Sequence, residues 1–181
     1  ISWYDDRDSL GIASVYTDKN GNYAIEGLPY GEYSLTVYKD TSYATITDRA
    51  EIEQQTVFTG GSNADASIIQ DYRYENNIKM YALNAGVSGT VYKTVNDATT
   101  PADTVTVSLT LGDTDFVPYM YTATTDSAGN YSFANLPAYN ASMTVLPHND
   151  GTNDFGAGSS SETLKSGVTT VNENITVTLN E

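Results

Sequence analysis

The sequence contains no cysteine, one histidine and only 8 lysine and arginine residues among its 181. Without cysteine the chain can form no disulfide, no thiolate nucleophile and no cysteine-ligated zinc or iron–sulfur site. Nucleic acids and anionic membrane surfaces are bound largely through lysine and arginine, so their scarcity argues against both partners. The 23 aspartate and glutamate residues give a formal net charge of −15, which favours cations instead.

The sequence also lacks a hydrophobic run of the roughly 20 residues that a membrane-spanning helix needs. We also find no leader in which charged residues are followed by an apolar stretch, so we expect no membrane insertion. The chain begins at Ile1 rather than methionine, which indicates a processed chain or a piece of a longer one. With 39% hydrophobic residues it can nevertheless form a core, which argues against wholesale disorder.

Familiar catalytic patterns are missing as well. His148 has no second histidine to pair with, and the sequence has neither a Gly-x-Ser-x-Gly elbow nor a Gly-rich phosphate loop. Carboxylates are numerous, but their spacing singles out no glycosidase pair. We therefore expect a protein that is not an enzyme.

What the sequence does contain is alternation of apolar and polar residues. Residues 104–111 (TVTVSLTL) and 174–179 (NITVTL) alternate strictly, which predicts strands with one face on a core and one in water. Turn signals such as 20–21 (NG) and 128–130 (AGN) recur at short intervals. Short alternating strands separated by frequent turns predict an all-β sandwich or barrel.

An internal repeat divides the chain. Residues 17–37 align without gaps to residues 125–145, at an offset of 108, and ten of the 21 positions are identical. A repeat of this kind predicts two copies of one small β-domain. We place the first domain at residues 1–84 and the second at residues 85–181, joined near Asn84-Ala85-Gly86.

The repeated motif has a physical interpretation. Residues 18–22 (DKNGN) and 126–130 (DSAGN) predict a hairpin turn, in which the aspartate side chain caps the bend and glycine supplies a positive φ. Tyr23 and Tyr131 then begin the return strand. A Leu-Pro pair ends that strand in each copy, because proline cannot continue a central ladder.

The pattern T-D-x-x-G-x-Y-x-[IF]-x-x-L-P-x-G-x-Y-x-L-x-V resembles the B-type repeats of Gram-positive adhesins (Cna-B-type) and the regulatory-like domain of carboxypeptidases. The resemblance implies two tandem transthyretin-like, Ig-like Greek-key β-sandwiches. Residues 17–37 match almost every position, whereas the second copy has Tyr139 and Ala141 where the family has glycine and tyrosine. Such modules occur in adhesins, receptors, pilins and enzymes, so the resemblance implies a fold rather than a function.

The resemblance also implies that the first domain lacks its opening strand. Residues 86–92 (GVSGTVY) resemble the family's first strand, and the first copy has no counterpart before residues 1–4 (ISWY). The sequence is either cut from a longer tandem array or leaves an edge that accepts a strand from another subunit. Head-to-tail donation does not close and would build a filament. The expected acceptor edge is Ile1, Trp3 and Tyr4, and the candidate donor or edge strands carry Val87, Val91, Ile175, Val177 and Leu179.

Acidic loops make calcium the best candidate for a small ligand, because Ca²⁺ prefers several oxygen ligands from one loop. None of the loops has the twelve-residue EF-hand spacing, and acidic loops also keep β-rich surface proteins soluble. The candidate ligands are Asp5, Asp6, Asp8, Asp113, Asp115, Asp150 and Asp154.

Some of the resembling adhesin repeats join a first-strand lysine to a last-strand asparagine by an isopeptide bond. The resemblance points to Lys93 with Asn174 or its neighbour Asn172. The buried carboxylate that assists this reaction in the family has no counterpart on a middle strand here, which disfavours the bond.

Aromatic residues are plentiful, with 15 tyrosines, four phenylalanines and one tryptophan. Trp3-Tyr4, Tyr72-x-Tyr74 and Tyr119-x-Tyr121 are candidate sugar-stacking platforms. Aromatic residues spaced by two positions are more often half-buried strand residues or interface anchors.

Together these features predict a secreted, cell-surface structural protein, a stalk or filament subunit whose partners are copies of itself or neighbouring repeats. The alternative is an adhesion or carbohydrate-binding module whose partner is a glycan or a host surface. An exposed aromatic face would favour the alternative.

Overall fold

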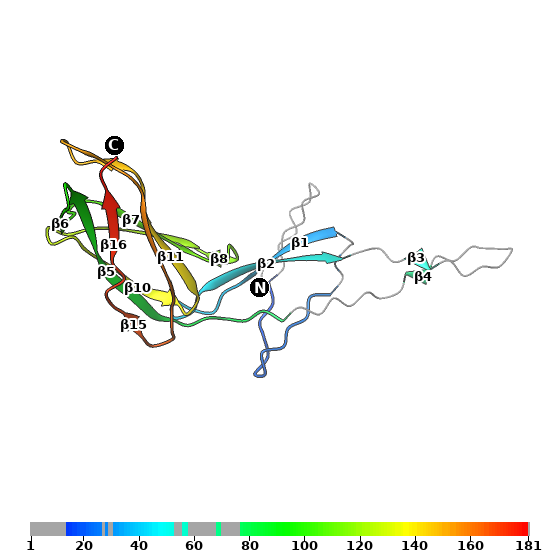
Figure 1. Ribbon diagram of the computed structural model, residues 1–181. Helices are drawn as coiled ribbons and strands as arrows, with labels where there is room; N and C mark the ends of the chain where they lie inside the picture. The colour runs from blue at the N-terminus through cyan, green and yellow to red at the C-terminus, as the bar shows by residue number, and fades with distance from the viewer. Residues whose placement is uncertain are drawn as a thin grey trace. The chain divides into compact units, whose positions relative to one another are not determined.

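The computed structural model describes residues 14–26, 28, 31–52, 56–57, 68–69 and 77–180. Within these ranges the regular secondary structure consists of β-strands, with no helix, as Figure 1 shows. The all-β prediction is therefore confirmed. No helix in the described ranges is long and apolar enough to cross a membrane.

Contacts divide the chain into two compact units. One is drawn from Ile1–Tyr38 with Ile46–Lys79, and the other from Lys39–Thr45 with Met80–Glu181. The expected joint at residues 84–86 lies inside strand β5 (Leu83–Val95) and is not a linker. Backbone hydrogen bonds hold the segment 39–45 to the start of β5, since the amide of Leu83 donates to the carbonyl of Ser42 at 2.8 Å.

The first sheet of the second unit is built around β5. This strand pairs antiparallel with β10 (Asn130–Pro137) and β6 (Ala98–Pro101), and parallel with β15 (Thr169–Thr170) and β16 (Ile175–Thr178). In Figure 1, β5 and β16 run side by side in the same direction. β5 is therefore an interior strand with partners on both sides.

The second sheet contains four antiparallel strands. The predicted strand at residues 104–111 forms its centre, with every second residue buried, which agrees with the alternation in the sequence. In sheet order the strands are β14 (Gly158–Thr163), β11 (Asn140–Val145), β7 (Thr106–Leu111) and β9 (Met120–Thr124). The short strands of this unit are β8 (Phe116–Val117), β12 (His148–Asn149) and β13 (Asp154–Phe155).

The core of the second unit lies between its two sheets. Full burial of a Val, Leu, Ile or Met side chain contributes about 1.5–3 kcal/mol to the stability of the fold, relative to leaving that side chain exposed. This packing closes the unit as a β-sandwich. The fully buried side chains include Val87, Val91, Ile175 and Val177 from the first sheet, and Val107, Leu109, Met143 and Val145 from the second.

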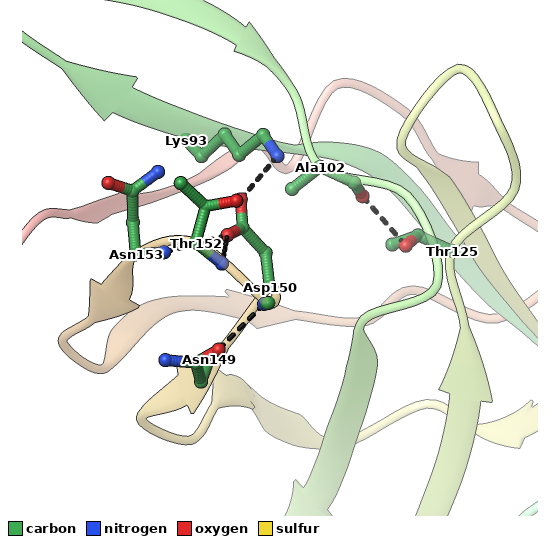
Figure 2. Close-up of polar contacts among 8 residues, drawn as sticks. Lys93, Ala102, Thr125, Asn149, Asp150, Thr152 and Asn153 are labelled. Carbon is green, nitrogen blue, oxygen red and sulfur yellow. Dashed lines mark hydrogen bonds and ion pairs between the residues drawn. The ribbon is translucent and has the colours of Figure 1, made fainter.

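One buried polar side chain ties two strand connections together. The hydroxyl of Thr125 donates to the carbonyl of Ala102 at 2.7 Å and accepts from the amide of Val105 at 2.9 Å. Figure 2 shows the first of these bonds. Thr125 is buried, and this single hydroxyl satisfies two backbone groups that would otherwise lack a partner.

The described part of the first unit is built on a hairpin of β1 (Gly31–Val37) and β2 (Thr45–Ile52), paired antiparallel. Along β1 the side chains of Tyr33, Leu35 and Val37 are buried and alternate with more exposed residues. A second short pair is formed by β3 (Thr56–Val57) and β4 (Ile68–Ile69).

The return strand expected to begin at Tyr23 is not formed, because residues 22–26 have no strand structure. The equivalent segment of the second unit, β10, is held along β5. The described residues of the first unit contain no strand in the position of β5. Tyr23 instead packs as a half-buried residue against Tyr33 and Leu35.

The repeated turn has the same structure in both units. Asp18 Oδ1 accepts hydrogen bonds from the amides of Asn20 at 2.8 Å and Asn22 at 2.9 Å, and Gly21 has a φ of 86°. The amide of Asn22, followed by its side chain, lowers the pKa of the Asp18 carboxyl below its ordinary value. The aspartate cap and the glycine with positive φ agree with the prediction, but the turn does not join two paired strands of a hairpin, because β9 and β10 belong to different sheets and residues 22–26 form no strand.

In the second unit Asp126 Oδ1 accepts from the amides of Ala128 and Asn130, both at 2.9 Å, and Gly129 has a φ of 75°. The Asn130 amide is the main cause of the lowered pKa of Asp126. Five consecutive residues thus determine the turn wherever they occur in the chain.

Candidate functional site: the seam between the first and last strands of the second unit

The second unit begins and ends with strands that lie next to each other. β16 runs parallel to β5 with Ile175 opposite Val91 and Thr178 opposite Thr94, while β15 sets Thr169 opposite Gly86. We call the pairing of residues 86–94 with residues 168–179 the seam. It joins the two ends of the unit directly.

Backbone and side-chain hydrogen bonds continue the seam between β15 and β16. The amide of Glu173 donates to the carbonyl of Ser88 at 3.1 Å. One position further along, Asn174 Oδ1 accepts from the amide of Thr90 at 2.9 Å, so that a side chain replaces a backbone carbonyl. The interruption between the two strands therefore leaves few gaps in the ladder.

Gly89 allows the close approach at this interruption. A Cβ at this position would overlap the carbonyl oxygen of Glu173, so no other residue fits without displacing the backbone. The hydroxyl of Tyr131 donates to the same carbonyl. Burial, with a further contribution from the charge of Glu173, raises the pKa of Tyr131 to about 12.

The apolar side of the seam lies in the core. Val91, Ile175 and Val177 have no exposed surface, and Leu179 is half-buried and bridges to Phe155. Together with Val87, these are the residues predicted for donor or edge strands. The structure brings them together across one seam of a single chain, with β5 in the interior of its sheet. The acceptor-edge residues Ile1, Trp3 and Tyr4 lie outside the described ranges.

Lys93 and Asn174, the candidate isopeptide pair, engage different partners. Lys93 lies level with Val177, and its Nζ is 2.8 Å from Asp150 Oδ2 (Figure 2). Asn174 lies level with Thr90 and binds its amide. The hydrogen bond from Lys93, and then those from the amides after Asp150, lower the pKa of the Asp150 carboxyl to about 2.

The described acidic candidates for calcium form hydrogen bonds with other residues of the second unit. Asp113 Oδ2 accepts from the hydroxyl of Tyr139 at 3.3 Å, and Asp113 Oδ1 accepts from the amide of Asp115 at 3.0 Å. Asp154 Oδ1 accepts from Asn149 Nδ2 at 2.7 Å. In the part of the chain that the structure describes, no three His, Cys, Asp or Glu side chains gather into a metal-binding group. Asp5, Asp6 and Asp8 lie outside that part, so a calcium site stays a prediction.

An aromatic cluster forms from residues far apart in the sequence. The rings of Tyr81, Phe116 and Tyr139 meet edge to face, with centroids 5.1–5.6 Å apart. The negative charge of Asp113 is the main cause of the raised pKa of Tyr139. No spacing in the sequence indicates this cluster, because its members come from three separate segments.

The aromatic pairs singled out in the sequence have other positions. Tyr119 is 45% exposed, and Tyr121 lies half-buried on β9. Trp3-Tyr4 and Tyr72-x-Tyr74 lie outside the described ranges. The described residues therefore place one of the three predicted pairs, at the edge of the second sheet.

The sequence analysis did not predict the roles that three residues have in the seam: Gly89, the hydroxyl of Tyr131 and the side chain of Asn174. Gly89 carries a usable signal, because an isolated glycine within a strand pattern often marks a close backbone approach. Tyr131 and Asn174 carry none, since their partners are more than 40 positions away.

No protein-family model and no curated protein matches this chain. Among solved structures, the chain is similar to a Pseudomonas aeruginosa protein crystallised as a proposed carbohydrate binding protein. The two share 13% identity over 52% of this chain and 88% of that one, with a TM-score of 0.35.

Proposed function

We propose that the chain is a non-enzymatic structural module of an extracellular, cell-surface protein, in which tandem β-sandwich units serve as a stalk or spacer. The duplicated turn carries this proposal. Both copies keep the residues that build a framework, namely the capping aspartate, the glycine with positive φ and the tyrosine that follows. A spacer needs its framework repeated and places few other demands on its side chains.

The charge of the chain supports the same role. A net charge of −15 keeps neighbouring copies apart and opposes edge-to-edge association of β-sheets. Strand β14 at one sheet edge carries Ser159, Ser160 and Ser161, which are polar residues suited to an exposed strand.

Small-angle X-ray scattering on the full chain tests the spacer role. A compact particle of 181 residues would have a radius of gyration of about 16 Å, and an unfolded chain about 45 Å. We expect a folded monomer clearly above the compact value, with circular dichroism and a cooperative melt confirming that it is folded. A folded particle at the compact value would contradict a stalk.

Head-to-tail assembly by strand donation is the filament form of this proposal. It is supported by the difference between β10, which pairs with β5, and residues 22–26, which form no strand. Multi-angle light scattering over a range of concentrations, with calcium and then with chelator, should show growing oligomers. A monomer at every concentration would exclude this form.

Carbohydrate binding is the second candidate, and the aromatic cluster favours it. Tyr81 and Tyr139 are only half-buried, and the Asp113 carboxylate beside Tyr139 could accept hydrogen bonds from sugar hydroxyls. A glycan array with the unaltered chain and with Tyr139→Ala tests it. Binding that Tyr139→Ala abolishes would support this function, whereas an array without binding would count against it.

A further inference from the structure

We propose that the seam is a mechanical clamp, which resists unfolding when the second unit is pulled from its two ends. This rests on the proposed function, since a stalk at a cell surface carries tension along its chain. The clamp follows from how β5 and β16 run, and it requires no ligand.

The direction of the strands decides how force acts on the seam. Within the longer stretch of the unit, Met80–Glu181, the chain enters the seam at the Leu83 end of β5 and leaves it beyond Thr178 of β16. Because β5 and β16 are parallel, these two points lie at opposite ends of their pairing. Tension therefore slides β5 and β16 past each other in opposite directions. The evenly spaced bonds of a parallel ladder then bear the load together and do not open one after another.

The seam carries bonds along its whole length. It begins with the amide of Gly86 donating to Val168 at 3.0 Å and ends with the amide of Leu179 near the carbonyl of Thr94 at 3.4 Å. Between these ends lie the β15 and β16 ladders and the side-chain bond from Asn174 to Thr90. Sliding by one position would have to break all of these bonds at once.

Two further features oppose sliding. The Glu173 carbonyl fits against Gly89 and accepts from the Tyr131 hydroxyl, so the seam has an interlocking step in its middle. On its other edge β16 is bonded to the β13 region, where the amide of Gly156 donates to Thr178 at 2.9 Å. The last strand is therefore held from both sides.

Single-molecule pulling of the full chain in two directions tests the clamp. The sequence contains no cysteine, so introduced cysteines provide unique attachment points. Asn77→Cys with Asn180→Cys loads the seam in shear. Ala98→Cys with Asn180→Cys pulls at one end of the seam, because Ala98 pairs with Val95 next to the Thr94 end. We expect a rupture force several-fold higher in shear than in peeling. Equal forces in the two directions would overturn the proposal.

A matched pair of variants locates the resistance in the seam. Asn174→Ala removes the side-chain bond to Thr90, and Asn140→Ala removes a comparable exposed bond, from Thr163 Oγ1 at 2.8 Å, between β11 and β14. We expect Asn174→Ala to lower the shear force and to accelerate forced unfolding several-fold, with Asn140→Ala unchanged. Equal losses in both variants would contradict a clamp localised at the seam.

The outcomes separate the clamp from the stalk. Forced unfolding reports the unfolding rate, whereas denaturant melts of the same variants report equilibrium stability. If the two pulling directions give equal forces while scattering still shows an extended folded particle, the clamp fails and the stalk stands. If scattering shows a compact particle while the rupture force in shear is several-fold higher than in peeling, the stalk fails and the clamp remains a property of the unit.

Discussion

The repeated turn has the same structure in both units, but only in the second unit does a strand begin directly at its end. Asp18 and Asp126 cap their turns through equivalent bonds, with nearly equal lengths. After the turn, β10 pairs with β5, whereas residues 22–26 form no strand. A turn capped by its own side chain is determined locally, while a strand forms only where a partner is available.

We expect the largest difference in stability between the two units when equivalent core residues are truncated. Met143 is fully buried in the second unit, and its counterpart Leu35 packs partly against half-buried neighbours. We expect Met143→Ala to reduce the free energy of unfolding of its unit by about 2–5 kcal/mol. The loss for Leu35→Ala should lie at or below the lower end of this range, because the half-buried neighbours of Leu35 can relax into the cavity that the substitution creates.

Hydrogen–deuterium exchange by NMR measures each unit separately in the same sample. Faster exchange confined to the second unit is expected for Met143→Ala. Equal losses in the two variants would mean that the two units have equally tight cores.

The turn glycines offer a second comparison. Ala in the left-handed region costs about 1–2 kcal/mol at either position. At Gly21 no atom of the described residues lies within 4 Å of a new Cβ, whereas at Gly129 the carbonyl oxygen of Val91 lies 2.7 Å away. We therefore expect Gly129→Ala to destabilise its unit more than Gly21→Ala, as measured by chemical denaturation followed by NMR. The reverse order would show that the contact at Gly129 relaxes without cost.

A smaller effect is expected from the hydroxyl of Tyr131. Its removal in Tyr131→Phe should cost about 0.5–1.5 kcal/mol, the usual contribution of one hydrogen bond. The pKa of Tyr131 is raised from 10.0 to about 12, so the folded state keeps its proton while the unfolded state loses it. Stability from this group is therefore complete below pH 10 and is lost as the pH rises towards 12.

Alkaline melts of the unaltered chain and of Tyr131→Phe test this pH dependence. The variant should lose less stability between pH 10 and 12. Tyr119→Phe, which alters an exposed tyrosine of the same unit, is the control and should behave like the unaltered chain. A variant that follows the same alkaline curve would show that other groups govern it.

The smallest effect concerns the two capping aspartates. Both carboxyls have a pKa lowered from 3.8 by hydrogen bonds from the turn. Each contributes stability above that pH and loses it as the pH falls through the folded value. Carbon-13 NMR titration should find both carboxyl pKa values below 3.8 in the folded chain, and at their ordinary value in the chain unfolded in urea. A lowered pKa at only one of them would break the equivalence of the two turns.

The features that the sequence predicts correctly are those set by neighbouring residues. The alternation at 104–111 and the motif at 126–130 each contain the information for their own strand or turn. The return strand predicted at Tyr23 is not set by neighbouring residues alone. The same local pattern forms a strand, β10, in the second unit, where β5 lies beside it.

The seam shows where sequence analysis of single segments stops. The sequence analysis assigned Val91 and Ile175 to donor or edge strands, and nothing local in the sequence indicates that they face each other in a parallel pairing. The pairing is decided by how the whole second unit folds. Asn174 serves as an acceptor for Thr90 only because that topology brings them together.

The buried hydroxyl of Thr125 also acts during assembly of the fold. It satisfies the carbonyl of Ala102 and the amide of Val105 only when both segments are correctly aligned. A misaligned pairing would leave two buried backbone groups without partners, each costing about 1–3 kcal/mol. Thr125 thereby discriminates against near-native mispairings, and it selects one alignment from several that the apolar residues alone would accept.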